Sequence, residues 1–252
     1  MDKLEHSLWI VQAVNVVLQP LIGRPVPNYL VMCGLIVVVV AIFGIVVRAR
    51  LSVEHPSQLQ VLLEDGISAL RGLLQSFVGE KADRYLGIVG ALGLFILIGN
   101  YMGLVPGLMA PTSNINVTVG CALTMWIYYH IQGVKEQGLI SYLKHFAAPP
   151  GAPLFLAPIM LPIEIISHLS RVLSLSLRLF GNIFGEELVI LILFSIVPLF
   201  VPLPMMFLGL ITGGLQAFIF VMLGTIYLGL AVGTEHDAEH GHGHEHAPAH
   251  AH

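Results

Sequence analysis

Long apolar runs separated by short polar segments are the dominant pattern in this chain. A helix needs about 20 apolar residues to cross a hydrocarbon core of about 30 Å. Backbone groups inside a bilayer must be hydrogen-bonded within their own segment, so each run is expected to be a helix. The runs cover residues 29–47, 85–104, 115–133, 160–197 and 205–232. The pattern predicts an all-α polytopic membrane protein with about five membrane segments, in one membrane domain over residues 29–234.

The polar interlude after the first run has its own periodicity. Leucine and isoleucine recur at helical spacing over residues 57–78, and polar side chains fall largely on the rest of the helix surface. Ser57 followed by Gln60 has the spacing of a capping box. We expect an amphipathic helix that lies on the membrane, against a partner, or on the neighbouring spans. Residues 1–28 hold a short apolar stretch without a cleavage signal, so an outer or interfacial segment is expected there.

Basic residues are unevenly distributed among the loops. The loop between the second and third runs carries no lysine or arginine, whereas the segments after the first and third runs are basic. Their basic residues are Arg48, Arg50, Arg71, Lys81, Arg84, Lys135 and Lys144. Because positive residues accumulate on the cytoplasmic side, the N-terminus is expected outside and the C-terminus inside. The amphipathic helix is then cytoplasmic.

The last two runs are too long for simple spans. No proline interrupts residues 163–197, and a helix of that length would measure about 50 Å. Either the helix breaks near Gly181 and Gly185, or it is strongly inclined in the membrane. Three prolines at positions 198, 202 and 204 join it to the final run. We expect these two runs to form a long, strongly inclined helical hairpin.

Ionisable residues gather inside the fourth run, where each one is costly and is a functional hypothesis by default. They are Glu164, His168, Arg171, Arg178, Glu186 and Glu187. Arg178 sits in the middle, and an arginine keeps its proton in a protein, so it cannot relay one. It can attract a carboxylate and repel a passing cation. An acid on one side of a fixed cation and two acids on the other suggest two aqueous half-channels that do not connect directly.

A purely structural interpretation of the same charges is an ion pair between Arg178 and Glu186 or Glu187 that stabilises a bundle. Arg171 lies nearer the inner end and can either extend to the membrane surface or face the protein. Glu164 and His168 are four residues apart, the spacing of two metal ligands, but the sequence shows no third ligand, so no metal site is expected there.

Composition removes several classes of function. Of 252 residues, 56% are hydrophobic and only 10% charged, which excludes an ordinary soluble domain, and there is no basic cluster for nucleic acid. The sequence contains no GxxxxGK[ST], HExxH or GxSxG motif, so we expect no nucleotide site, no hydrolase centre and no cofactor. Residues 235–252 have no apolar pattern and are expected to be a disordered cytoplasmic tail. Three of their histidines, His242, His244 and His246, are candidates for adventitious metal binding.

Several motifs occur in the order found in one known family. They are PSQLQVLLE, GNYMGLVPG, PTSNINVT, SLSLRLFGNIFGEEL and LQAFIFVMLGTIYL. From about Tyr29 to Gly233 the chain resembles subunit a of bacterial F-type ATP synthases. The resemblance implies a non-catalytic inner-membrane subunit that passes protons through two half-channels to and from a rotating ring of c subunits. It also implies a b-subunit peripheral stalk and other ATP synthase subunits as partners.

The resemblance also implies roles for individual residues. An arginine at the position of Arg178 faces the ring and separates the half-channels, and Gln216 faces it from the last helix. By the same match, Asn182 and Glu187 fall on functional positions. Glu164, with His168 one turn away, belongs near the inner half-channel, and Asn100 near the outer one.

The chain departs from some relatives in three places. It has Gly209 where they carry a histidine, Glu186 where they carry a small residue, and Gly103 where they carry an acid. Glu186, with Glu187 nearby, is therefore expected to take the place of that histidine in the outer path, and the choice between Glu186 and Glu187 as proton relay stays open. The remaining alternative is a secondary transporter or channel, although no second copy of the 164–187 pattern suggests an inverted repeat.

Overall fold

The computed structural model describes residues 9–52, 56–105, 108–140, 142, 157–196, 200 and 202–232. Within those ranges the chain forms helices and no strand. The helices are α1 (Trp9–Ile22), α2 (Asn28–Ala49), α3 (Gln58–Val78), η1 (Gly79–Lys81), α4 (Ala82–Met102), η2 (Pro111–Ser113), α5 (Ile115–Gln137), α7 (Ala157–Ile196) and α8 (Pro202–Val232).

Four helical stretches in the described residues are long and apolar enough to cross a membrane. They are Asn28–Ala49, Gln58–Met102, Pro158–Ile196 and Pro202–Val232. These stretches confirm an all-α, multi-pass membrane protein. The expected segment at residues 115–133 is helical, as α5, but it is not among the four, because polar and aromatic residues dilute its apolar ones.

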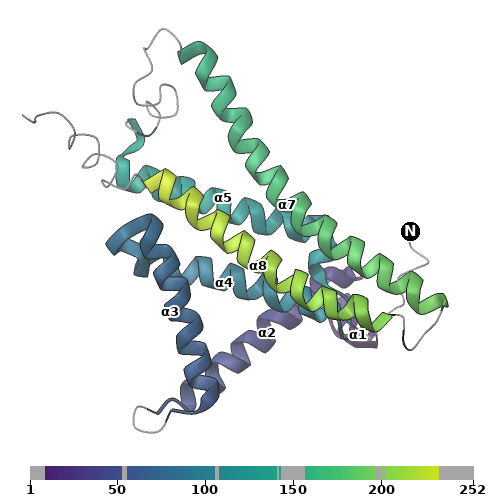
Figure 1. Cartoon of the computed structure of the whole chain (residues 1–252). Helices are drawn as coiled ribbons and strands as arrows, with labels where there is room; N and C mark the ends of the chain where they lie inside the picture. The colour runs from purple at the N-terminus through teal and green to yellow at the C-terminus, as the bar shows by residue number, and fades with distance from the viewer. Residues whose placement is uncertain are drawn as a thin grey trace, which may run out of the picture.

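The helices α4, α5, α7 and α8 lie side by side and enclose the main core (Figure 1). Their buried contacts include Tyr85 and Ile96 of α4, Met125 of α5, Leu179 of α7 and Phe220 of α8. Small residues permit the closest approaches, since a Cβ on Gly93 of α4 would lie 2.5 Å from Val221 of α8.

The α2 helix and the first turns of α3 diverge from this bundle (Figure 1), whereas the last turns of α3 pack on α4 and α8 and add Leu74 and Val78 to the main core. The α3 helix begins as expected, because the Ser57 hydroxyl accepts a hydrogen bond from the Gln60 amide at 3.2 Å. The Gln60 side chain does not complete the capping box. It bonds the backbone of Ser52 and the Glu64 carboxylate instead, and so closes the turn after α2.

The α7 helix is continuous over 40 residues and passes through Gly181 and Gly185 without a break. Of the two geometries left open by the sequence, the structure therefore has the unbroken helix, about 60 Å long. Its first turns carry no buried residue and lean away from α8, whereas its last turns run close to the start of α8 (Figure 1).

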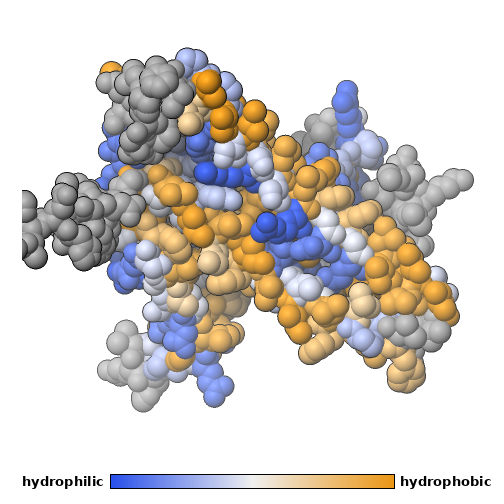
Figure 2. All heavy atoms as spheres, turned by 45° about the horizontal axis from the view of Figure 1, so that its top comes forward, coloured by the Kyte–Doolittle hydropathy of each residue, from blue (hydrophilic) through white to orange (hydrophobic). Residues whose placement is uncertain are grey.

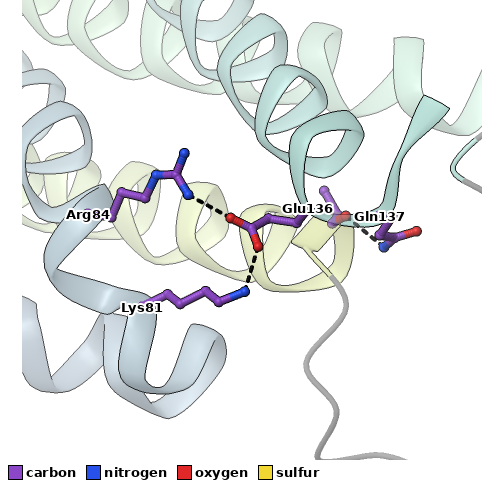
Figure 3. Close-up of polar contacts among 5 residues, drawn as sticks. Lys81, Arg84, Glu136 and Gln137 are labelled. Atoms are coloured by element: carbon purple, nitrogen blue, oxygen red, sulfur yellow. Dashed lines mark hydrogen bonds and ion pairs between the residues drawn. The ribbon is translucent and has the colours of Figure 1, made fainter.

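The ends of α4 and α5 that lie on the predicted cytoplasmic side are joined by charges. Lys81 and Arg84 contact the two oxygens of Glu136 at 2.5 and 2.7 Å, and the Gln137 amide donates to the Ala231 carbonyl at 2.9 Å (Figure 3). These contacts tie η1, α4, α5 and the end of α8 together.

Candidate functional site

The middle of α7 has a buried face and an exposed face. Val172, Leu175, Leu179 and Ile183 are buried against α5 and α8 at helical spacing. Arg178, one residue before Leu179, is exposed together with neighbouring leucines. Figure 2 shows a hydrophilic patch in the middle of an otherwise largely hydrophobic surface. A charged side chain therefore projects from an apolar surface that an isolated bundle would present to lipid.

Arg178 is not the partner of either nearby acid in the part of the chain that the structure describes. Glu186 contacts Thr212, and Glu187 contacts the backbone at Ala110. The bundle-stabilising ion pair considered from the sequence is therefore not formed among the described residues. Because none of the described acids pairs with it, the exposed Arg178 guanidinium is available to a group outside this chain.

Glu186 packs directly on α8. Its carboxylate occupies the space that a Cβ on Gly209 would need, so the two positions are complementary. The Thr212 hydroxyl donates a hydrogen bond to Glu186 Oε2 at 3.1 Å. A glycine at 209 is thus a steric requirement for this placement of the acid.

Glu187 points to a different element. The Ala110 amide donates to its Oε1 at 2.8 Å, just before η2. The same oxygen lies 2.9 Å from the place of a Cβ on Gly103. The acid on α7 thus fills the space beside Gly103, just after α4.

Asn100 is 4% exposed and joins three elements near these acids. Its Nδ2 donates to the Gly213 carbonyl of α8 at 2.9 Å. Its Oδ1 accepts from the Thr112 hydroxyl of η2 at 2.8 Å. The amide therefore holds α4, η2 and α8 together near Glu186 and Glu187.

The amides of Asn182 and Gln216 meet across α7 and α8. Asn182 Nδ2 donates to Gln216 Oε1 at 2.8 Å. Gln216 is 1% exposed, and its Nε2 has no hydrogen-bond partner among the described residues. Asn182 is one turn from Arg178 on α7, so this pair lies between the arginine and Glu186.

A second polar group lies on the other side of Arg178. Glu164 Oε1 is 3.3 Å from His168 Nε2, and His168 Nδ1 is 3.0 Å from the Tyr129 hydroxyl. The guanidinium carbon of Arg171 lies 5.1 Å from the centre of the Tyr227 ring. Arg171 therefore faces α8 rather than the membrane surface.

Thr212, Thr112 and Tyr129 are contacts of the site that were not predicted from the sequence. Tyr129 of α5 is buried, with 2% of its surface exposed. Thr212 had a detectable signal, because it lies one helical turn from Gln216 on the last helix. No such signal points to Thr112, whose contact depends on how the loop folds.

No group of three or more possible metal ligands occurs in the described ranges. His242, His244 and His246, the candidates for adventitious metal binding, lie outside those ranges. The acids and amides instead form two separate polar clusters along α7. Along the helix axis, Glu164 lies about 21 Å from Arg178 in one direction, and Glu186 lies about 12 Å from it in the other.

Comparisons with known proteins identify the family of the chain. The family described as ATP synthase A chain matches residues 30–229. ATP synthase subunit a of Syntrophobacter fumaroxidans is 44% identical over 202 residues, which cover 79% of this chain and 83% of that protein. The subunit of the same description from Geobacter sulfurreducens is 40% identical over 224 residues, covering 88% and 96%. The chain therefore belongs to the ATP synthase subunit a family.

Proposed function

We propose that this chain moves protons across the bacterial inner membrane as the stationary partner of a rotating c-subunit ring. The observation that carries the proposal is the order of groups along α7, with an exposed Arg178 between two separate polar groups. The subunit itself is not an enzyme in this proposal. It couples proton flow to ATP synthesis carried out by other subunits of the complex.

Each polar group along α7 lines one half-channel. The outer path uses Glu186 and Glu187 with Asn100, and it reaches Arg178 through Asn182 and Gln216. The inner path uses Glu164 with His168. The N-terminus lies outside and the tail in the cytoplasm, consistent with the basic residues at 48–84.

Arg178 separates the two paths by electrostatics. A ring carboxylate that has taken a proton is neutral, so it can face lipid at low cost. When it returns to Arg178, the positive charge favours its ionised form, and the proton leaves. The membrane potential supplies about 2.3 kcal/mol per charge per 100 mV.

The partners follow from the same surfaces. The c ring would cover the exposed face of α7 around Arg178. The b-subunit stalk and the other ATP synthase subunits would bind elsewhere on the chain, and lipid would cover the remaining apolar surface.

Replacement of Arg178 tests the proposal in vesicles that contain the whole ATP synthase. Arg178→Ala is expected to abolish ATP-driven proton pumping and to leave a passive, ring-dependent leak. Arg71→Ala, which removes an exposed arginine paired with Asp83, is the matched control and should pump normally. Pumping that survives Arg178→Ala would contradict the proposal, and ring-independent conduction by this chain would favour a transporter.

A further inference from the structure

Thr212 is the one polar side chain of α8 between Gly209 and Gln216, and its hydroxyl contacts Glu186. We propose that Thr212 is a positioning residue for proton transfer at Glu186, because its hydroxyl keeps that carboxyl group hydrogen-bonded in both protonation states. The inference rests on the proposed function, in which Glu186 belongs to the outer proton path.

Three acceptors lie within reach of the same hydroxyl. Thr212 Oγ1 is 3.1 Å from Glu186 Oε2, 3.1 Å from the Leu208 carbonyl and 3.3 Å from the Gly209 carbonyl. A hydroxyl has one proton to donate and two lone pairs with which to accept. Rotation about the C–O bond therefore redirects the proton between the carboxylate and the backbone of α8 without moving either helix.

This rotation matches the needs of a group that gains and loses a proton. When Glu186 is ionised, the hydroxyl donates to the carboxylate in a charge-assisted bond. When Glu186 is protonated, its own O–H donates to Thr212 Oγ1, and the threonine proton turns to the carbonyl of Leu208 or Gly209. Both states leave these partly buried groups hydrogen-bonded, so neither traps the proton.

No other described side chain donates a hydrogen bond to Glu186. On α7, the ionisable groups nearest to Glu186 are Glu187 and, two helical turns away, Arg178. On α4, the nearest is Tyr101, whose hydroxyl lies against Gly214. The outer half of α8 over residues 202–216 and the η2 residues contain no ionisable side chain, and Cys121 is the first on α5. Thr212 is thus the group that can respond most directly to a change of charge on Glu186.

The experiment compares two substitutions of Thr212 in vesicles carrying the whole complex, with proton flux measured against the pH of the outer side. Thr212→Val keeps the shape but removes the hydroxyl, and Thr212→Ser keeps the hydroxyl. Thr212→Val should reduce flux about tenfold and move the midpoint of the profile up by about one pH unit, because the ionised acid loses a charge-assisted hydrogen bond. Thr212→Ser should restore most of the flux and the wild-type midpoint.

Thr225→Val is the matched control on the same helix. Thr225 is fully buried, and its hydroxyl donates to the Val221 carbonyl at 2.9 Å. This variant should retain the wild-type profile. If Thr212→Val also retains it, or if Thr212→Ser is as impaired as Thr212→Val, the inference is overturned.

A second background separates this inference from the proposed function. In Glu186→Gln membranes, adding Thr212→Val should change neither flux nor midpoint further. A shift that persists in that background would mean that Thr212 acts on another group, which overturns the inference. Wild-type flux in Glu186→Gln itself would remove Glu186 from the proposed path, whereas an impaired Glu186→Gln with a normal Thr212→Val would overturn the Thr212 inference alone.

Discussion

Gly209 and Glu186 form a complementary pair at the scale of single residues. The carboxylate of one residue occupies the space left by the missing side chain of the other. The polar side chain of α7 thus lies between the last two long helices, and α8 makes room for it with a glycine.

Gly209→Ala should disturb this pair strongly. Its Cβ would coincide with the Glu186 carboxylate, so the acid would have to move or the helices separate, at a cost of about 1–3 kcal/mol. We expect a lower melting temperature of the complex and a severalfold loss of proton pumping. Gly44→Ala on α2, where a Cβ would meet nothing within 4 Å, should change neither. Equal behaviour of the two variants would refute the steric argument.

Residue types and family pattern are enough to propose Arg178, Glu186 and Glu187 from the sequence, because charges inside an apolar run are conspicuous. The partners of these acids could not be proposed in the same way. Thr212 and the Ala110 amide meet them only through the packing of α7 on α8 and η2, and helical spacing within one segment carries no information about contacts to another.

At the scale of elements, a hydrogen bond between Tyr129 and His168 connects α5 to α7. Tyr129→Phe should remove it while keeping the ring packing, at a cost of about 1 kcal/mol. Because His168 also contacts Glu164, we expect slower proton flux on the inner side as well as a lower melting temperature. Tyr128→Phe, about 100° away around α5, is the control. Unchanged flux in Tyr129→Phe would show that the contact is only structural.

The charged contact between η1–α4 and α5 should make stability depend on pH. A hydrogen bond from Lys81, followed by the charges of Lys81 and Arg84, holds the pKa of Glu136 below its usual value. Ionised Glu136 therefore stabilises the folded state above about pH 4.3, and this contribution is lost as the pH falls through the lowered pKa.

Glu136→Gln should lower the melting temperature at pH 7 by about 2 °C, and the two proteins should converge near pH 3. Asp83→Asn, whose partner Arg71 is half-exposed, is the control and should have a smaller effect. A difference that is the same at pH 3 and pH 7 would exclude the charge of Glu136 as its cause.

Helix lengths were predictable from hydropathy, but the course of α7 was not. The glycines at 181 and 185 permit either a break or a continuous helix, since their effect depends on what packs beside them. Apart from the chain neighbours and the backbone of α7 itself, no described atom lies within 4 Å of a Cβ built on either one, so their lack of a side chain is not needed for packing among the described residues.

At the scale of the whole molecule, the orientation in the membrane is testable with cysteines. In a background without Cys33 and Cys121, Asn116→Cys should react with a membrane-impermeant maleimide only from outside. Glu80→Cys should react only from the cytoplasmic side. Both positions are exposed in the structure. The reverse pattern would contradict the orientation drawn from the basic loops.

The overall class of the molecule followed from the sequence because a bilayer restricts spanning segments to a few structures. Its layout did not follow. The packing of the end of α3 on α4 and α8, and the separate cluster that α1 and α2 form with Met102, depend on contacts between distant segments. Apolar runs of similar composition give no preference for one neighbour over another.

The unbroken α7 also has a mechanical meaning. A rod of about 60 Å bends much less under a sideways load than two rods joined by a hinge. Arg178 lies between two supports, the contact of His168 with Tyr129 and that of Glu187 with Ala110. A lateral push on the arginine would be shared by both ends and passed to α5 and η2. The same helix that presents the charge can therefore hold it still against a moving neighbour.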